Sequence, residues 1–75
     1  MARISFDNGN SYLDPTDDHG EIMEGLEGHD WDVIVALMDD DTREETHSAF
    51  EYDESDNLGF LLAYLKRAKC DLVIG

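Results

Sequence analysis

The sequence predicts a small α+β domain, in which an N-terminal β-hairpin and a C-terminal strand form one antiparallel or mixed sheet covered by three to four helices. Two observations predict the sheet: Asn-Gly at positions 8–9 lies between alternating apolar and polar residues, and the stretch DLVI at positions 71–74 contains three successive apolar residues. Between them, four segments place apolar residues at helical spacing. We expect one compact domain, residues 1–75, near the lower size limit for folding without disulfides or metal.

The stretch RISFDNGNSYLD predicts the hairpin. A type I′ turn needs positive φ at both central residues, and Asn8 and Gly9 adopt that conformation at low cost. The register stays open, and the apolar residues available to the two strands are Ile4, Phe6, Tyr12 and Leu13. The stretch DLVI is expected to add a closing strand to this hairpin.

A first helix is expected with Asp14 as N-cap, Pro15 as the first helical residue and Gly28 as the stop. On a helical wheel, its apolar side carries Ile22, Met23 and Leu26. The opposite side carries only carboxylates, namely Asp17, Asp18, Glu21, Glu24 and Glu27. Gly20 and Gly25 should weaken this helix by roughly 1 kcal/mol each relative to alanine, which favours fraying or a break.

Residues 31–38 suit either a second helix or a buried strand. Val33–Val35 favour a strand, whereas the apolar residues of the segment recur at helical spacing. Asp30 in the N-cap position and Asp32 in the first turn favour the helix. Trp31 is expected to anchor the core, with an exposed interface role as the alternative.

A third helix is expected within residues 40–52. Asp41 is its predicted N-cap, and Glu44 three residues later completes a variant of the capping box. Its modest inner face would be formed by Thr42, Thr46, Ala49 and Phe50.

A fourth helix, residues 55–69, is expected to be the main core helix. Its predicted cap is Ser55 or Asp56, and basic residues lie at its C-terminal end, where they suit the helix dipole. One side of this helix carries Leu58, Leu61, Leu62 and Leu65.

Charge is distributed unevenly along the chain, which has a net charge of −14. Residues 14–57 hold 17 of the 19 acids against Arg43 alone, whereas residues 58–75 hold three basic residues against Asp71. Size scaling gives a surface of about 4,700 Å², hence about one net charge per 330 Å², and this self-repulsion destabilises the monomer. A halophilic protein would be expected to spread its acids more evenly.

The spacing of potential ligands does not match a catalytic or metal motif. A calcium loop starting at Asp53 needs glycine at position 6, but Gly59 stands at position 7. Asp39–Asp41 would hold Mg²⁺ or Ca²⁺ only loosely, because adjacent helical side chains diverge by about 100°. The three histidines share no metal-ligand spacing, and Cys70 is expected to be a small buried residue. We therefore expect no enzymatic activity, no metal and no cofactor.

The location expected for this protein is the cytoplasm. A single cysteine allows no intramolecular disulfide, so nothing indicates an oxidising compartment. The first residues do not resemble a signal peptide, and the longest apolar run, VIVALM, is too short to span a membrane.

The density of acids along the first predicted helix is close to that of a nucleic acid. Asp17–Glu27 would place five carboxylates on about 15 Å of helix, roughly one per 3.7 Å, against one phosphate per about 3.4 Å of a DNA strand. A basic groove that releases counterions from phosphates would respond similarly to these carboxylates. The alternative is an acidic surface that serves solubility only, and the segregation of the acids argues against it.

Three stretches, RISFDNGNSY, DWDVIVALMDDDTREETH and FLLAYL, resemble the short acidic proteins encoded on phages and other mobile elements. Among these, the chain is most similar to small anti-CRISPR proteins that inhibit the type I-C Cascade surveillance complex. The resemblance covers most of the chain but rests on overall character, without a diagnostic motif. It implies a compact protein without enzymatic activity or cofactor, which occupies the DNA-binding or PAM-reading surface of Cascade and blocks target recognition.

We therefore expect a monomeric, DNA-mimicking inhibitor in the host bacterial cell that binds a basic surface of a Cascade subunit, and neither nucleic acid nor membrane. The residues predicted to bind this partner, as one anionic face beginning at Asp17, are Asp17, Asp18, Glu21, Glu24, Asp39, Asp40, Asp41, Glu44 and Glu45. The leading alternative is an interaction module, such as an antitoxin or regulator, that binds a basic protein through Trp31 and apolar edges. A third class is a calcium-responsive or metal-buffering protein.

Overall fold

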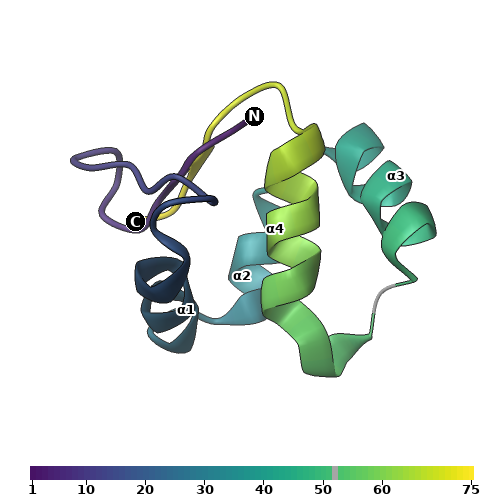
Figure 1. Ribbon diagram of the computed structural model, residues 1–75, viewed down its shortest axis with the longest axis horizontal. Coiled ribbons are helices and arrows are strands. Elements are labelled where there is room, and N and C mark those ends of the chain that lie inside the picture. The colour runs from purple at the N-terminus through teal and green to yellow at the C-terminus, as the bar shows by residue number, and fades with distance from the viewer. Residues whose placement is uncertain (52) are drawn as a thin grey trace.

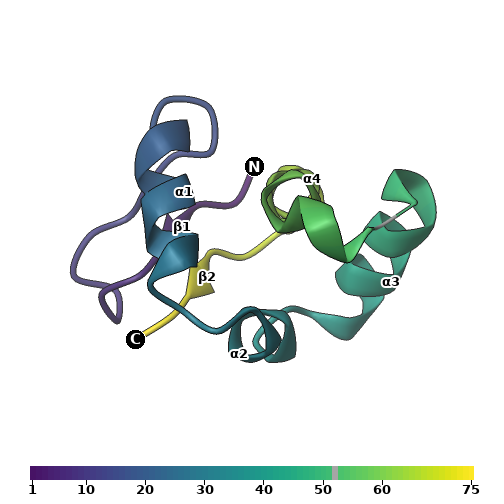
Figure 2. The same cartoon turned by 90° about the horizontal axis from the view of Figure 1, so that it is seen from below.

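The computed structural model describes residues 1–51 and 53–75 and confirms the α+β class. Its elements in chain order are β1 (Ile4–Ser5), α1 (His19–Glu27), α2 (Trp31–Ala36), α3 (Asp40–Phe50), a 3₁₀ turn (Glu54–Asp56), α4 (Asn57–Arg67) and β2 (Leu72–Val73). Figures 1 and 2 show α4 in the middle of the molecule, with α3 on one side and the sheet and α1 on the other. The accessible surface, 4753 Å², agrees with the value expected from chain length.

The sheet is smaller than the sequence predicts. β1 and β2 pair in parallel, with Ile4 opposite Leu72 and Ser5 opposite Val73. The second strand of the predicted hairpin is reduced to one antiparallel bridge, in which Ile4 and Leu13 exchange backbone hydrogen bonds of 3.1 and 2.7 Å. With this bridge the arrangement is mixed, but its only regular ladder among the described residues is the parallel one.

The predicted type I′ turn at Asn8-Gly9 is confirmed. Asn8 and Gly9 have φ angles of +58° and +86°, and the Asn10 N–H donates to the Asp7 carbonyl at 3.3 Å. The Asn8 N–H also donates to the Ile74 carbonyl at 2.8 Å. This bond ties the turn to the segment that contains β2.

Side-chain hydrogen bonds within the turn explain why the hairpin is short. The Ser5 hydroxyl accepts the Gly9 N–H at 2.8 Å, and the Asp7 carboxylate accepts the Ser11 N–H at 2.9 Å. These backbone donors are therefore satisfied locally, by the short polar side chains that compete with a sheet ladder. The chain rejoins β1 only at Leu13.

Helix α1 begins later than predicted. Asp14 caps a separate turn, in which its carboxylate accepts the Thr16 N–H at 2.8 Å. The Asp14 backbone N–H donates to the Asp18 carboxylate at 2.8 Å, which links the two ends of this turn. Asp18 is also the N-cap residue of α1. The break lies before Gly20, whereas the end at Gly28 is as predicted.

Helix α3 takes Asp39 as its N-cap, so the prediction of Asp41 was wrong by two residues. The Asp39 carboxylate accepts hydrogen bonds from the Asp41 N–H and the Thr42 hydroxyl, which makes it the better cap. The described helix ends at Phe50. Its predicted extension to Tyr52 lies outside the described residues.

Helices α2 and α4 have the caps that the sequence predicts. The Asp30 carboxylate accepts the Asp32 N–H at 3.3 Å, so the segment is a helix and not a strand. Of the two candidate caps for α4, Asp56 holds the position, and its carboxylate accepts the Gly59 N–H at 3.2 Å.

The core gathers around α4, as predicted. Trp31 packs against its edge, with its ring 6.0 Å from that of Phe60 in an edge-to-face arrangement. The Tyr64 hydroxyl accepts the Asp39 N–H at 2.7 Å and links α4 to the start of α3. The hydrophobic side chains with no exposed surface are Ile4, Ile22, Ile34, Leu61 and Leu65.

Three residues expected inside are exposed. Met23 is 48% exposed because α1 is buried along a narrow strip centred on Ile22. Ala49 lies on the outer side of α3. Cys70 is a free, exposed thiol in the bend between α4 and β2, where the chain changes direction.

Candidate functional site

The nine carboxylates predicted to bind a partner fall into two groups. Asp17, Asp18, Glu21 and Glu24 belong to α1 and the turn before it, and Asp39, Asp40, Asp41, Glu44 and Glu45 belong to the first half of α3. Figures 1 and 2 show α1 and α3 at opposite ends of the long axis, along which the Cα atoms extend over 31 Å. The prediction of one continuous anionic face was therefore wrong, because the nine carboxylates lie at two separate ends of the molecule.

Three of the nine carboxylates form hydrogen bonds or an ion pair with other groups of the protein. Asp18 closes the turn before α1, and Asp39 caps α3, where the hydrogen bond from Thr42 lowers the pKa of its carboxyl group. Asp40 forms an ion pair with Arg43 at 2.7 Å. Folding alone accounts for these three acids.

The other six accept no hydrogen bond and form no ion pair with any described residue. All six are exposed: Asp17, Glu21, Glu24, Asp41, Glu44 and Glu45. Glu21 and Glu24 lie one turn apart on α1, and Asp41, Glu44 and Glu45 lie on one side of α3. Glu21 and Asp41 lie in the first turns of their helices, where the helix dipole favours acids. Glu24, Glu44 and Glu45 lie farther along, where like charges at this spacing oppose helix formation, so the stability of the helices does not explain these three.

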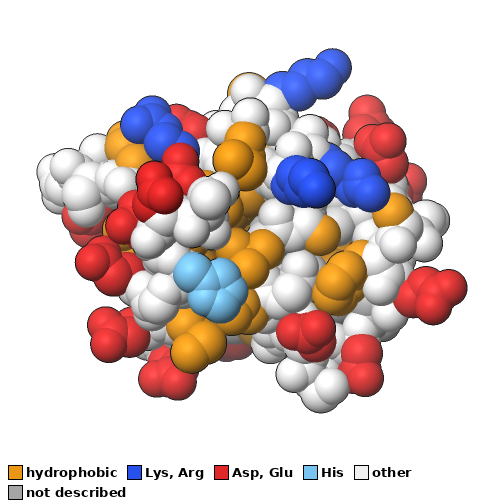
Figure 3. All heavy atoms as spheres, viewed as in Figure 1, with side chains coloured by type: hydrophobic (Ala, Val, Ile, Leu, Met, Phe, Trp, Pro, Cys, Tyr) orange, Lys and Arg blue, Asp and Glu red, His pale blue; other side chains and the backbone are white. Residues whose placement is uncertain are grey.

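One basic side chain, Arg43, lies within the acidic end at α3, and no Lys or Arg belongs to α1. In Figure 3 several blue side chains lie near the C-terminal end of α4 and another lies apart from them at the upper left beside red ones, while red side chains lie along the margins of the molecule over α1 and α3. Arg3 is engaged by the Asp71 carboxylate at 3.0 Å and lies over the Tyr12 ring, 4.6 Å from its centre. The segregation of charge along the chain is therefore only partial in space, since Arg43 and Lys69 both interact with carboxylates at the α3 end.

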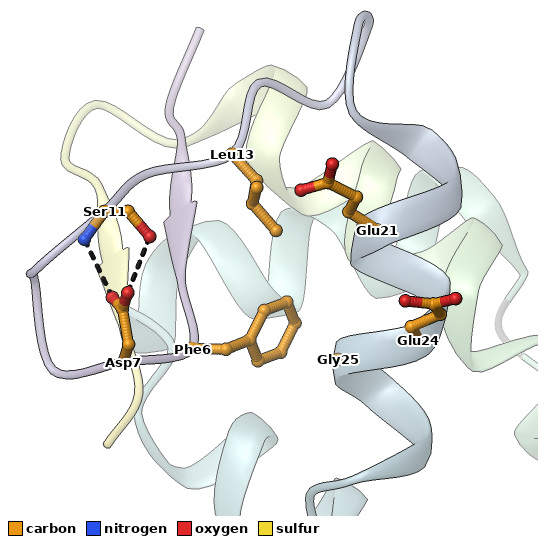
Figure 4. Close-up of a pocket in the computed structure, with 7 residues that line it drawn as sticks. All are labelled: Phe6, Asp7, Ser11, Leu13, Glu21, Glu24 and Gly25. Carbon is orange, nitrogen blue, oxygen red and sulfur yellow. Dashed lines mark hydrogen bonds between the residues drawn. The ribbon is translucent and has the colours of Figure 1, made fainter.

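Two of the free carboxylates line a cavity of about 450 Å³ between α1 and the Asn8-Gly9 turn. Its lining residues are Phe6, Asp7, Ser11, Leu13, Glu21, Glu24 and Gly25. Figure 4 shows the Phe6 ring pointing at α1 beside Gly25, with Leu13 entering the same space and the Glu21 carboxylate reaching toward it. The cavity thus has an apolar floor and an acidic border.

Asp7 supplies a fixed charge at the wall of this cavity. Its carboxylate accepts hydrogen bonds from the Ser11 hydroxyl at 2.6 Å, the Ser11 N–H at 2.9 Å and the Ser5 hydroxyl at 2.8 Å. These donors, Ser11 foremost, lower the pKa of Asp7 from 3.8 to about 2. The group is ionised at any physiological pH.

The predicted site did not include the part of this cavity that the N-terminal segment contributes, namely Phe6, Asp7, Ser11 and Leu13. A local signal was present: an aspartate directly before Asn-Gly, with serine four residues after it, is typical of a side chain that caps its own turn. What no local pattern indicates is that α1 packs opposite this turn.

A second cavity, of about 250 Å³, lies where α2, α3 and α4 meet. It is lined by Val35, Arg43, Glu44, His47 and Phe60. Arg43 closes one side, where its guanidinium donates to the Val35 carbonyl at 3.2 Å. Glu44 therefore also stands at the border of a hollow.

Within residues 1–51 and 53–75, no group of three or more His, Cys, Asp or Glu side chains is arranged to hold a metal ion. None of the helices in this part of the chain combines the length and apolar character that a membrane crossing requires. Comparison with models of protein families, with curated proteins and with solved structures yields no match.

Proposed function

We propose that this protein is an anti-CRISPR inhibitor that binds a basic surface of the Cascade complex and blocks recognition of target DNA and its PAM. The observation that carries the proposal is the set of six exposed carboxylates with no partner among the described residues, within a chain of net charge −14. Their mutual repulsion is offset when a basic groove binds them and releases its counterions.

The proposed mechanism is steric and electrostatic, without enzymatic chemistry or a cofactor. A monomer in the bacterial cytoplasm is steered to the basic channel by its negative field, and the occupied channel no longer admits DNA. The two acidic ends can each contact a basic surface, so the structure calls for a separate test of each end.

The test uses two charge-reversed variants of equal net charge, Glu21→Lys/Glu24→Lys on α1 and Glu44→Lys/Glu45→Lys on α3. Fluorescence anisotropy measures DNA binding by Cascade at increasing inhibitor concentration. Reversal at the end that contacts Cascade should raise the half-inhibitory concentration at least tenfold, because two attractions become repulsions. The other variant serves as its control.

Neither variant should unfold more readily than the parent, since each lowers the net negative charge. Inhibition by the parent should weaken steeply as salt rises. Full inhibition by both variants would contradict the proposal that carboxylates make the contact.

A second candidate function is a small acidic interaction module, such as an antitoxin or regulator, that docks on a basic protein through apolar contacts. Exposed hydrophobic side chains favour it: Val33 and Leu37, four residues apart at α2, are 53% and 50% exposed. In that case Val33→Ser/Leu37→Ser would weaken binding to the basic protein partner more than either of the charge-reversed variants does. The affinity for this partner would also depend little on salt concentration.

A further inference from the structure

We infer that the cavity between α1 and the Asn8-Gly9 turn is a socket for one arginine side chain of a basic protein partner. The inference rests on the proposed function, since it names the group that the acidic surface at α1 receives. It joins a preformed apolar floor to carboxylates whose hydrogen-bonding capacity is unused.

The floor is held in place by close packing. A Cβ atom at Gly25 would lie 2.5 Å from the Phe6 ring, so the ring rests directly on the backbone of α1. The ring also stacks with His29, with centres 5.3 Å apart. Phe6 and Leu13 therefore present fixed apolar surface to a ligand without rearrangement.

The border supplies charge and free acceptors. Glu21 and Glu24 are exposed and accept no hydrogen bond from the described residues, whereas Asp7 already accepts three hydrogen bonds from Ser5 and Ser11 and contributes mainly charge. Both glutamates line the cavity from neighbouring turns of α1, and Figure 4 shows the Glu21 carboxylate directed toward Leu13 and the Glu24 carboxylate lying over the α1 ribbon, farther from Phe6. A guanidinium could be held by both.

Arginine is the ligand whose chemistry matches both parts of the cavity. Its aliphatic stem covers apolar surface, and its planar head donates paired hydrogen bonds to carboxylates. Lysine offers the stem without the planar fork. A metal ion would need converging oxygen ligands, which the described residues do not assemble.

The experiment titrates N-acetyl-arginine amide into ¹⁵N-labelled protein and follows the Gly25 and Ser11 amide resonances by NMR. We expect saturable shifts at both amides and none with N-acetyl-citrulline amide, which keeps the shape but lacks the charge. Glu21→Gln/Glu24→Gln should weaken binding about tenfold. The matched control Glu44→Gln/Glu45→Gln, with the same charge change, should alter it less than twofold.

Equal weakening by the two variants would mean that arginine only samples a diffuse negative field, and binding of the citrulline compound would mean that charge plays no part. Either result overturns the socket. Cascade is absent from this assay, so the two proposals fail separately. Arginine binding without inhibition of Cascade would contradict the proposed function but support the socket. Inhibition of Cascade without arginine binding would support the proposed function but contradict the socket.

Discussion

Thr46 buries a hydroxyl group that accepts and donates no hydrogen bond within the described structure. Valine has nearly the same shape and removes the unsatisfied group, so Thr46→Val should raise the free energy of unfolding by about 1 kcal/mol. Urea denaturation measures the change. The control is Thr42→Val, one turn earlier, which removes the donor to Asp39 and should lower stability. A loss of stability in both variants would mean that Thr46 is satisfied.

Asp7 predicts a specific pH dependence. Its pKa is lower in the folded protein, about 2, than the usual 3.8, so the ionised group stabilises the fold above pH 4 or so. That contribution is lost as the pH falls from about 4 to about 2. Ser11→Ala removes the main donor and should raise the Asp7 pKa toward its usual range, measured by ¹³C NMR titration of the carboxyl carbon.

The matched change for this titration is Ser55→Ala. Ser55 hydrogen-bonds Asp53 and lowers the pKa of that carboxyl group in the same way, but it lies outside the Asp7 turn. The Asp7 midpoint should not move in this variant. An unchanged midpoint in Ser11→Ala would show that the serine is not the cause of the low pKa.

Helix α1 contains two glycines, of which one has space for a larger side chain and the other has not. Nothing lies within 4 Å of a Cβ atom placed at Gly20, so Gly20→Ala should stabilise the protein by about 0.5 kcal/mol through helix propensity. At Gly25 the same atom would meet the Phe6 ring, and Gly25→Ala should destabilise by about 1–3 kcal/mol. Thermal denaturation of both variants checks the contrast, which similar shifts in one direction would contradict.

The Gly25 variant also bears on the cavity. A displaced Phe6 ring removes the floor, so arginine binding should fall in Gly25→Ala and persist in Gly20→Ala. Persistence in both would show that the ring does not form part of the socket.

Local chemistry predicted several helix boundaries well. Asp30 and Asp56 stand where their capping preferences place them, because each needs only its own neighbours along the chain. Gly28 ends α1 as predicted, although its backbone stays right-handed. Where several acids are adjacent, as in Asp39–Asp41, propensity alone does not choose among them. The Thr42 hydroxyl made that choice, through one side-chain hydrogen bond.

Pairing between distant segments could not be predicted in the same way. The closing strand was expected, but the parallel register of β1 with β2 depends on how α4 returns the chain, and no residue pattern encodes it. The acidic residues of α1 and α3 were likewise identified one by one, while their separation onto opposite ends follows from the packing of both around α4.

The whole molecule carries one net negative charge per about 340 Å² of surface. Raising NaCl from about 0.01 M to about 0.15 M shortens the Debye length from about 30 Å to about 8 Å, which screens this repulsion. The melting temperature should rise by a few degrees, measured by calorimetry, while binding to Cascade should weaken over the same range.

At equal ionic strength, Ca²⁺ and Mg²⁺ should raise the melting temperature by similar amounts, because both act by screening. A large rise with one ion alone would favour the metal-buffering alternative over diffuse charge. A melting temperature independent of NaCl would contradict the self-repulsion itself.

The parallel pairing of β1 with β2 has a consequence for the order of folding. The neighbouring contact between Arg3 and Asp71 joins residues 68 positions apart, and closing so long a loop costs entropy that later packing must offset. The turn that walls the cavity is itself held by the carbonyl of Ile74. During synthesis the acidic helices therefore emerge well before this cavity can exist, and a nascent chain is already strongly anionic while the proposed socket is still unassembled.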